Sequence, residues 1–435
     1  MTIATCCRRI LGLFSLVPLL SAAPFIVGDH PYHCGSDHRA GNNYTLNFAE
    51  FSDTGKPFCS EQLTHALEQI DAARADNESV VVLVYIHGWK NNASDDPTGD
   101  VKKFSDEVDA ISRILPKSGP GKNPPLVAIY LAWRGLTLTV EPFKTISYWP
   151  RRTVARRVGR TGMYDAVDQI VKKVGEARTR TTLIFVGHSF GARILENAAD
   201  AADKTGTKPG FMYRHLGVVR NRLSAMRQSP GTMTRTLPPL PPADLIVYVN
   251  AASASTVTRR TVKEWDAICK EGADSPVCMA HPFWLAFTST ADFATTWIMP
   301  VANAVFPALN SDGLHLISAA NTPWLHTHDV EEEKMCGKNR KPDDFDCPPG
   351  SNATACFGAI RDATKYCYEI KQLEPAAPVH PFWIMNVNGH VVKDHGDIWN
   401  PNVINLILSI MRQQQETVNL FREQMRKVPE TVPEK

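Results

Sequence analysis

The most constraining feature of the sequence is an apolar segment that runs into a serine with a glycine on either side. Residues 182–186 have the β-rich composition of a buried strand, and they lead into Gly187-His188-Ser189-Phe190-Gly191, after which a helix-like segment follows. Glycines two positions before and after a serine let a helix pass close to the strand that precedes it. The pattern predicts a sharp strand-to-helix turn with the helix N-terminus directed at the Ser189 hydroxyl. The alternative is an ordinary glycine-rich turn.

Strand and helix patterns alternate before this turn. Residues 80–86 and 126–133 are continuous apolar runs, as expected of strands buried on both faces of a parallel sheet. Residues 100–115 carry apolar side chains at helical spacing, and residues 163–174 form a second amphipathic helix pattern. This order predicts an α/β fold, with a mostly parallel, doubly wound sheet and helices on both faces.

These motifs resemble the α/β-hydrolase superfamily, and within it the exported bacterial serine hydrolases of the esterase or lipase kind. The resemblance covers the chain from about Val80 to the C-terminus, and it includes the pair His87-Gly88 directly after the strand that begins there. In the family, this pair opens a loop that donates one N–H group to an oxyanion. The resemblance therefore implies an oxyanion hole made by Trp89, or Gly88 beside it, and by Phe190. Taken alone, the pair would be a turn with a structural histidine.

The family also carries an acid and then a histidine, each just past a strand, because a carboxylate must fix the tautomer of the imidazole that accepts the serine proton. The strand at residues 245–250 is followed by no carboxylate. The next strand, from Phe283, leads to Asp292, which the resemblance makes the acid. The alternative is that Asp292 is only an N-terminal cap of the helix that follows it.

Two histidines follow the last predicted strand, at residues 381–387. His390 comes three residues after this strand, and His395 lies further on, in a segment that looks like the pre-helix histidine loop of bacterial hydrolases of this type. We therefore favour His395 and keep His390 as its rival. The order Ser189, Asp292, His395 matches the chain order of the superfamily.

The 435 residues divide into a signal peptide (1–23), an N-terminal extension (24–78) and an α/β-hydrolase domain (79–435). A minimal fold needs only one helix between the acid and the histidine, so the long separation predicts an insertion at about residues 320–380. A second insertion is expected at about residues 205–241.

The first 23 residues have the layout of a secretory signal. Two arginines precede an apolar stretch at residues 10–20, and small residues follow it at 21–23. The apolar stretch is too short to cross a bilayer comfortably. We expect an exported protein, periplasmic or secreted, with no stable membrane span once the signal is removed.

Cysteine usage agrees with export. Eight cysteines follow the predicted signal, and four of them, from Cys336 to Cys367, lie in a polar insertion with little apolar surface to bury. We expect two disulfide bonds in this Cys-rich insertion. Zinc would favour Cys-x-x-Cys spacing, which is absent, and the metal corner offered by His326, His328 and Asp329 has no further ligand in view. No metal is expected.

The charge balance gives no argument for a nucleic-acid partner, because the net charge is only +2. The basic segment Arg151–Arg157 lacks interleaved aromatic residues, so we expect a solvated face there. The resemblance implies hydrolysis of a carboxylic ester-like bond, in a small-molecule or lipid substrate, through an acyl-enzyme on Ser189 and without a cofactor. Two alternatives remain open: acyl transfer by the same triad, and a catalytically silent hydrolase-fold binding protein.

Overall fold

The computed structural model describes residues 27–35, 38–115, 123–138, 147–200, 209–228, 241–253, 255–269, 282–300, 318–333, 347, 351–362, 364–373 and 381–412. The predicted signal peptide therefore lies outside the described residues. Parts of both predicted insertions do as well.

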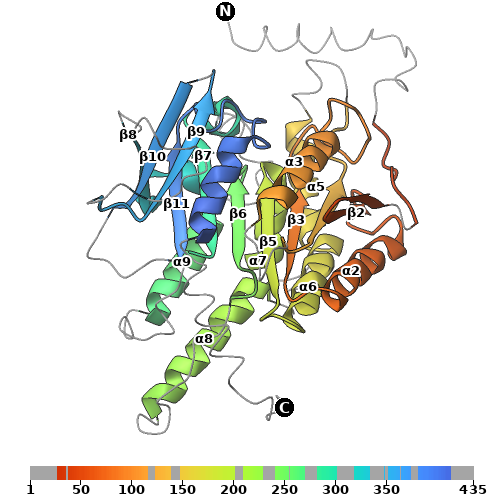
Figure 1. Cartoon of the computed structure of the whole chain (residues 1–435), viewed down its shortest axis with the longest axis horizontal. Helices are drawn as coiled ribbons and strands as arrows, with labels where there is room; N and C mark the ends of the chain where they lie inside the picture. Colours follow the sequence, from red (N-terminus) through yellow and green to blue (C-terminus); the bar gives the residue numbers. More distant parts are fainter. Residues whose placement is uncertain are drawn as a thin grey trace, which may run out of the picture.

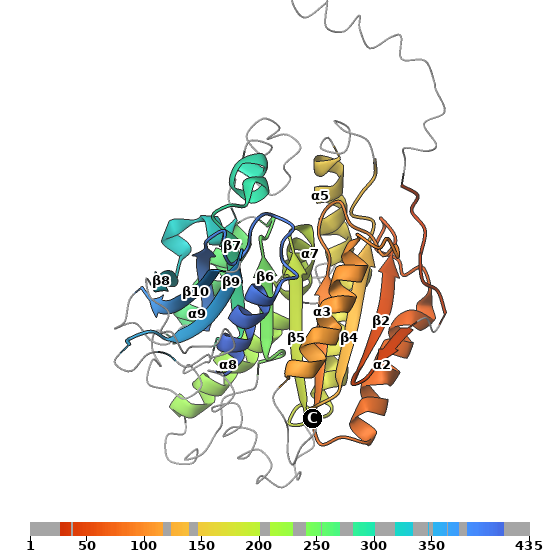
Figure 2. The same ribbon diagram turned by 45° about the horizontal axis from the view of Figure 1, so that its top comes forward.

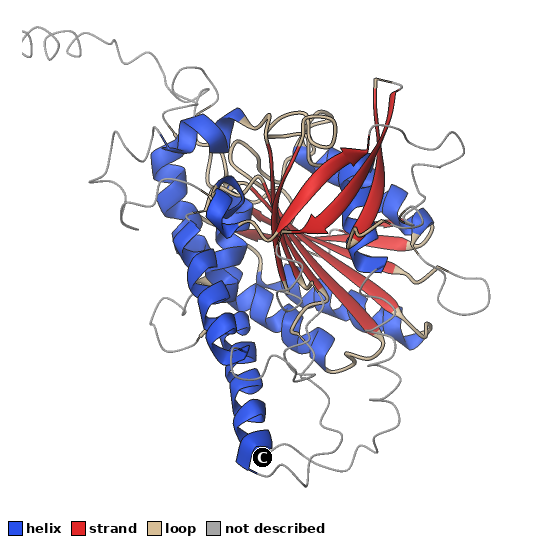
Figure 3. Ribbon diagram, turned by 90° about the vertical axis from the view of Figure 1, so that its left-hand side faces the viewer, coloured by secondary structure: helices blue, strands red, loops and turns tan. Residues whose placement is uncertain are grey.

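The centre of the molecule is an eight-stranded sheet in the order β1-β2-β4-β3-β5-β6-β7-β11. Every neighbouring pair is parallel except β1 and β2, so the predicted mostly parallel sheet is confirmed. Figure 3 shows the strands as a twisted fan with helices on both sides. The strands are β1 (His38–Gly41), β2 (Tyr44–Phe51), β3 (Val80–Ile86), β4 (Leu126–Trp133), β5 (Thr181–His188), β6 (Leu245–Val249), β7 (Trp284–Ser289) and β11 (Phe382–Val387).

Alternate strand residues face two separate hydrophobic cores. In β3, Val80, Val82 and Val84 enter one core, and Val81 and Leu83 enter the other. This period of two explains why the strand is apolar throughout: both of its faces are covered.

Helices on one face bury the first core. They are α2 (Ser60–Ala75), α5 (Tyr148–Gly159), α6 (Gly162–Gly175), α7 (Phe190–Asp200), α8 (Phe211–Gln228) and α9 (Ser255–Cys269). On the other face, α3 (Asp100–Ile114) and a helix at residues 401–412 bury the second core. Figure 1 shows this last helix in blue, in front of the sheet together with α3.

The part of the predicted 320–380 insertion that the structure describes forms a small antiparallel sheet in the order β8-β10-β9. Its strands are β8 (His328–Glu333), β9 (Ala355–Arg361) and β10 (Thr364–Gln372), and two short helices, η4 (Ala319–Asn321) and η5 (Pro323–Leu325), precede them. Asn402 joins this sheet to the 401–412 helix, because its side chain bonds both the N–H and the C=O of Ile360. The small sheet thus extends the second core beside β11, at the opposite end of the main sheet from β2 and α2 (Figure 2).

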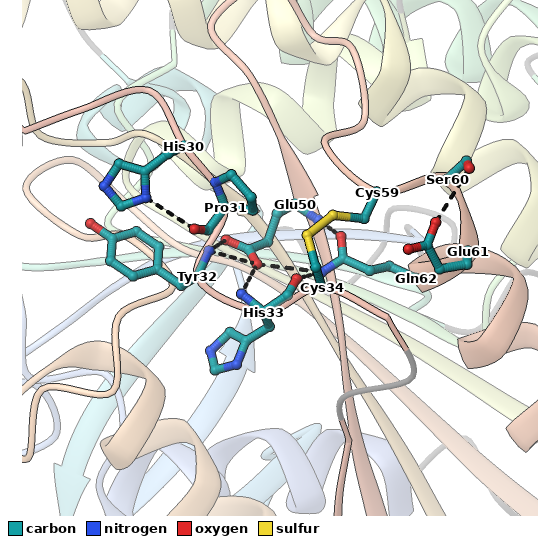
Figure 4. The surroundings of a disulfide bond; sticks show 10 residues. All are labelled: His30, Pro31, Tyr32, His33, Cys34, Glu50, Cys59, Ser60, Glu61 and Gln62. Carbon is teal, nitrogen blue, oxygen red and sulfur yellow. Dashed lines mark hydrogen bonds between the residues drawn. A yellow bond between two sulfur atoms is a disulfide. The ribbon is translucent and has the colours of Figure 1, made fainter.

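Part of the N-terminal extension belongs to the main sheet, because β1 and β2 add two strands at the side of β4. Disulfide Cys34–Cys59 ties the segment before β1 to the residue before α2. Beside it, the Glu50 carboxylate accepts hydrogen bonds from the backbone N–H groups of Tyr32 (2.9 Å) and His33 (2.6 Å) (Figure 4). The extension is thereby fastened to the strand that it contributes.

Cysteines in the predicted Cys-rich insertion are paired where the structure describes them. Cys347 bonds Cys356, and Cys367 is also in a disulfide, whereas Cys336 lies outside the described residues. Such bonds are consistent with an exported protein. Among the described residues, no helix is long and apolar enough to cross a membrane.

The expectation of a solvated face at Arg151–Arg157 is wrong for its first two residues. Arg151 and Arg152 are buried in α5, and the Arg151 guanidinium bonds both carboxylate oxygens of Asp53 at 2.7 Å. The sequence of α5 alone does not reveal this partner, because Asp53 comes from the loop after β2.

Candidate active site

Ser189 lies on a strained turn between β5 and α7, as the glycine pattern predicts. Its φ is +53°, in the left-handed region that non-glycine residues rarely adopt, and its side chain is 2% exposed. A Cβ atom on Gly187 would lie 2.6 Å from the Cα of Ala192, and a Cβ on Gly191 would collide with the carbonyl oxygen of Ile86. The turn therefore requires glycine at both positions.

The loop after β6 fixes the backbone of the serine. The Ser189 N–H donates to the carbonyl oxygen of Val249 (3.0 Å), and the Ser189 carbonyl oxygen accepts from the N–H of Ala252 (3.1 Å). Both the N–H and the C=O of Ser189 are therefore held at the end of β6. These bonds fix the backbone of Ser189 and with it the position from which the side chain starts.

The structure brings together the three side chains that the sequence analysis singles out. The Nε2 atom of His395 lies 2.8 Å from the Oγ of Ser189. Its Nδ1 atom lies 2.9 and 3.0 Å from the two carboxylate oxygens of Asp292. The imidazole therefore bridges a hydroxyl and a carboxylate, in a geometry that lets it accept a proton at Nε2 while Nδ1–H faces the acid.

His390 lies elsewhere, although it is only five residues away in sequence. Its ring stacks on Tyr366 at 3.9 Å, and its Nδ1 lies 3.3 Å from a carboxylate oxygen of Glu332. Both partners belong to the small sheet. His390 thus joins the insertion to the loop after β11.

The Asp292 carboxylate makes the contacts of a helix cap and also contacts His395. Its Oδ1 accepts the backbone N–H groups of Ala294 (2.9 Å) and Thr295 (3.3 Å), as a helix cap does, and its Oδ2 accepts the Thr295 hydroxyl. The same carboxylate bonds His395. Burial favours the neutral acid, but the hydrogen bonds from His395 and Thr295 outweigh it, and the pKa of Asp292 lies below its usual value. Asp292 is therefore ionised at neutral pH.

The loop after β3 brings Gly88 against the serine. A Cβ on Gly88 would lie 2.8 Å from the Cβ of Ser189, so only glycine permits this approach. Lys90, at φ +71°, donates its N–H to the carbonyl oxygen of Gly135, and the N–H of Gly135 donates to the carbonyl oxygen of Asn91. This pair of bonds pins the loop to the end of β4.

Phe190 and Trp89 are the other two residues predicted for the oxyanion hole. Phe190 is the first residue of α7, where the N–H groups have no partner one turn earlier in the helix. Trp89 packs its ring against Phe190 and Tyr148 and donates its indole N–H to the Ser147 hydroxyl. The indole therefore holds the position of the loop.

His87 has a structural role. Its Nε2 accepts the backbone N–H of Trp133 (3.1 Å), and its carbonyl oxygen accepts the Trp133 indole N–H (3.0 Å). Burial lowers the pKa of His87 to about 4, so the ring is neutral and Nε2 is free to accept. The ring thereby fastens β3 to β4 just before the Gly88 turn.

The two histidines that the sequence analysis considers as metal ligands make other contacts. His326 bonds the carbonyl oxygen of Ala320 at 2.8 Å, and His328 stacks on Trp383 at 4.1 Å. No group of three or more potential ligands gathers among the described residues.

Two residues that the sequence analysis did not single out for this site also contact the His395 loop. They are Asn250, directly after β6, and His188, directly before the serine. The available signal was positional, because Asn250 stands at the strand end where no carboxylate is found.

Comparison with known proteins adds little to this geometry. No family model and no curated protein matches the sequence. Among solved structures, a phospholipase, PlaB from Legionella pneumophila in complex with thio-NAD, is similar to this chain at 10% identity and a TM-score of 0.30. The match covers 80% of this chain and 62% of that one, so the chain spans less than two thirds of the phospholipase.

Proposed function

We propose that this protein is a serine hydrolase of the α/β-hydrolase type that cleaves a carboxylic ester-like bond through an acyl-enzyme. The observation that carries the proposal is the imidazole of His395, held 2.8 Å from the Ser189 hydroxyl and 2.9 Å from the Asp292 carboxylate. The strained serine turn and the close approach of Gly88 support it.

In the proposed reaction, His395 Nε2 takes the proton of the Ser189 hydroxyl as the oxygen attacks the acyl carbonyl carbon. The imidazolium then gives this proton to the leaving alcohol as the ester bond breaks, which leaves the acyl group on Ser189. A water molecule, deprotonated by the same Nε2, attacks the acyl-enzyme and releases the carboxylic acid. Asp292 stays ionised throughout and stabilises the imidazolium.

The developing oxyanion needs donors on the side of Ser189 that faces the β3 loop. We assign this role to the backbone N–H groups of Phe190 and of Trp89 or Gly88. The start of α7 supports the first assignment, because a helix N-terminus presents free N–H groups and a positive dipole end. The pinned loop at Gly88 supports the second, since donors in a fixed position need no reorganisation during the reaction.

An acyl group with an apolar chain fits the surroundings best. Phe293 and Trp297 are 65% and 61% exposed; Phe293 follows Asp292 directly, and Trp297 lies in the short helix after it. Large exposed apolar side chains beside a reactive centre favour an apolar substrate surface. We therefore propose a lipid or an apolar small-molecule ester as the substrate.

Covalent labelling by a fluorophosphonate probe tests the proposal, because the probe reacts only with an activated serine. We expect the wild-type protein to gain one label and Ser189→Ala to gain none, with an unchanged melting temperature. An unlabelled wild-type protein would indicate a catalytically silent binding protein. Product analysis with an added alcohol separates hydrolysis from acyl transfer, since transfer yields a new ester in place of the free acid.

A further inference from the structure

We propose that Asn250 and His188 are positioning residues that set the orientation of the His395 imidazole by holding its backbone carbonyl. The inference rests on the proposed function of His395. Both side chains converge on one atom: His188 Nε2 lies 2.7 Å from the His395 carbonyl oxygen, and Asn250 Nδ2 lies 3.1 Å from it. Two donors, one at the end of β5 and one at the end of β6, thus bond the loop at the residue that carries the imidazole.

Asn250 is suited to this position by its backbone and by both ends of its side chain. Its φ is +46°, a left-handed conformation that asparagine adopts more readily than most residues, and it is fully buried. Its Oδ1 accepts the N–H of Ser289 (3.0 Å), which fixes the amide so that Nδ2 faces the His395 carbonyl. The side chain therefore connects the ends of β6 and β7 to the histidine loop.

His188 contributes the second donor in a defined tautomer. The ring is 3% exposed, and burial, together with the neighbouring His395, lowers its pKa to about 3. A neutral ring whose Nε2 faces a carbonyl oxygen must carry its proton on Nε2. It therefore donates to the loop without placing a second positive charge beside the imidazolium of His395.

The loop depends on such bonds because it lies between β11 and the 401–412 helix and belongs to neither. A further bond, from the Ser289 hydroxyl to the carbonyl oxygen of Val392 (2.5 Å), holds the loop three residues earlier. Without the two donors, the peptide group of His395 has more freedom to rotate, and a displacement of about 1 Å at a reacting group can cost about 100-fold in rate.

Asn250→Gly removes the amide and keeps a residue that tolerates positive φ. We expect kcat for ester hydrolysis to fall roughly 10- to 100-fold, with KM unchanged within about twofold, because the amide does not contact the substrate in this proposal. The rate of fluorophosphonate labelling should fall in parallel. In a His395→Ala background, Asn250→Gly should cause no further loss, since its effect acts through the imidazole.

Asn402→Ala is the matched control. Asn402 is also buried, and its amide also bonds backbone groups, but these groups are those of Ile360 in the small sheet and the carbonyl oxygen of His390, five residues before His395. It should lower the melting temperature and leave kcat unchanged. If Asn250→Gly loses no more activity than this control, the proposed positioning role is wrong.

A pair of variants at His188 covers the case in which Asn250→Gly does not fold. His188→Gln retains a donor near the position of Nε2 and should recover most of the activity, whereas His188→Leu should lose it. Equal activities in the two variants would overturn the proposal. A wild-type protein that is not labelled at all refutes the proposed function instead, so the two failures are distinguishable.

Discussion

At the residue scale, the candidate site depends on one imidazole with three separate restraints. The ring of His395 is held at Nδ1 by a buried carboxylate and faces the serine at Nε2, and its backbone carbonyl is held by two side-chain donors. The groups that make these contacts stand at the ends of three strands, β5, β6 and β7. The geometry is therefore fixed before any substrate arrives, which is the condition for efficient proton transfer.

The two histidines after β11 give the clearest test at this scale. We expect His395→Ala to lower ester hydrolysis by roughly 10³-fold or more, since members of a triad act as a unit. His390→Ala should change the rate less than about threefold, because this ring lies half-exposed against Glu332 and Tyr366. Rates measured at matched concentrations of folded protein decide between them. A larger loss in His390→Ala would mean that His390, and not His395, transfers the proton.

The sequence identifies residues whose signal is local, and it misses residues whose role depends on distant pairing. Ser189 is recognisable because its two glycines stand beside it, and Asp292 and His395 because each follows a strand. Asn250 also follows a strand, but the sequence does not show its partner, which lies 145 residues further along the chain. The roles of all these residues in catalysis remain predictions until the variants are measured.

At the element scale, the segment after β7 has two functions that share one residue. Asp292 accepts backbone N–H groups at the start of η2 (Ala294–Ile298) and bonds His395, so the position of this short helix is linked to that of the imidazole. The same helix carries the exposed ring of Trp297, and Phe293 precedes it. The element therefore joins the proposed acid to the proposed apolar contact surface.

Removal of these two rings tests the apolar surface. We expect Phe293→Ala/Trp297→Ala to raise KM for a long-chain ester by roughly tenfold or more, because burial of an aromatic ring contributes about 1.5–3 kcal/mol. KM for an acetyl ester should change little. Ile114→Ala is a matched control. Ile114 is also exposed, but it ends α3, near the amino ends of the parallel strands, whereas Ser189 follows the carboxyl end of β5. Equal effects on both esters would argue against an apolar chain at this place.

Elements with a strong periodic pattern are predictable from this sequence, and elements that need a distant partner are not. Strands β3 and β4 begin and end where their apolar runs do. By contrast, the arginines of α5 predict a solvated segment, although Arg151 is buried against Asp53. A buried charge is stable only beside its partner, and the sequence of one helix does not show that partner.

At the scale of the whole molecule, buried histidines make the fold sensitive to acid. Burial lowers the pKa of His87 and His215 to about 4 and that of His188 to about 3. The unfolded chain binds these protons near pH 6.5, so stability falls as the pH drops from about 6.5 toward 4. Asp100 acts in the opposite sense, because burial raises its pKa to about 6 and the folded state keeps its proton longer.

Together, these three histidines and Asp100 contribute the effect of roughly two groups, or about 2–3 kcal/mol of unfolding free energy per pH unit between pH 6 and 5. Urea unfolding at a series of pH values measures this slope. His215→Gln should reduce the slope by about 1.4 kcal/mol per pH unit, since the variant removes one titrating ring. His215 is packed against Phe283 and not against the candidate site. An unchanged slope in this variant would show that His215 does not contribute to the pH dependence of stability.

The position of β11 at the end of the sheet has a consequence for the timing of activity during synthesis. This strand is the last to be added in chain order, and it leads directly to the loop that carries His395. A nascent chain that has emerged only as far as Asp292, just after β7, contains the serine and the proposed acid but lacks the proposed proton acceptor. In the proposed mechanism, Ser189 therefore becomes reactive only after a further 206 residues have been added to the growing chain.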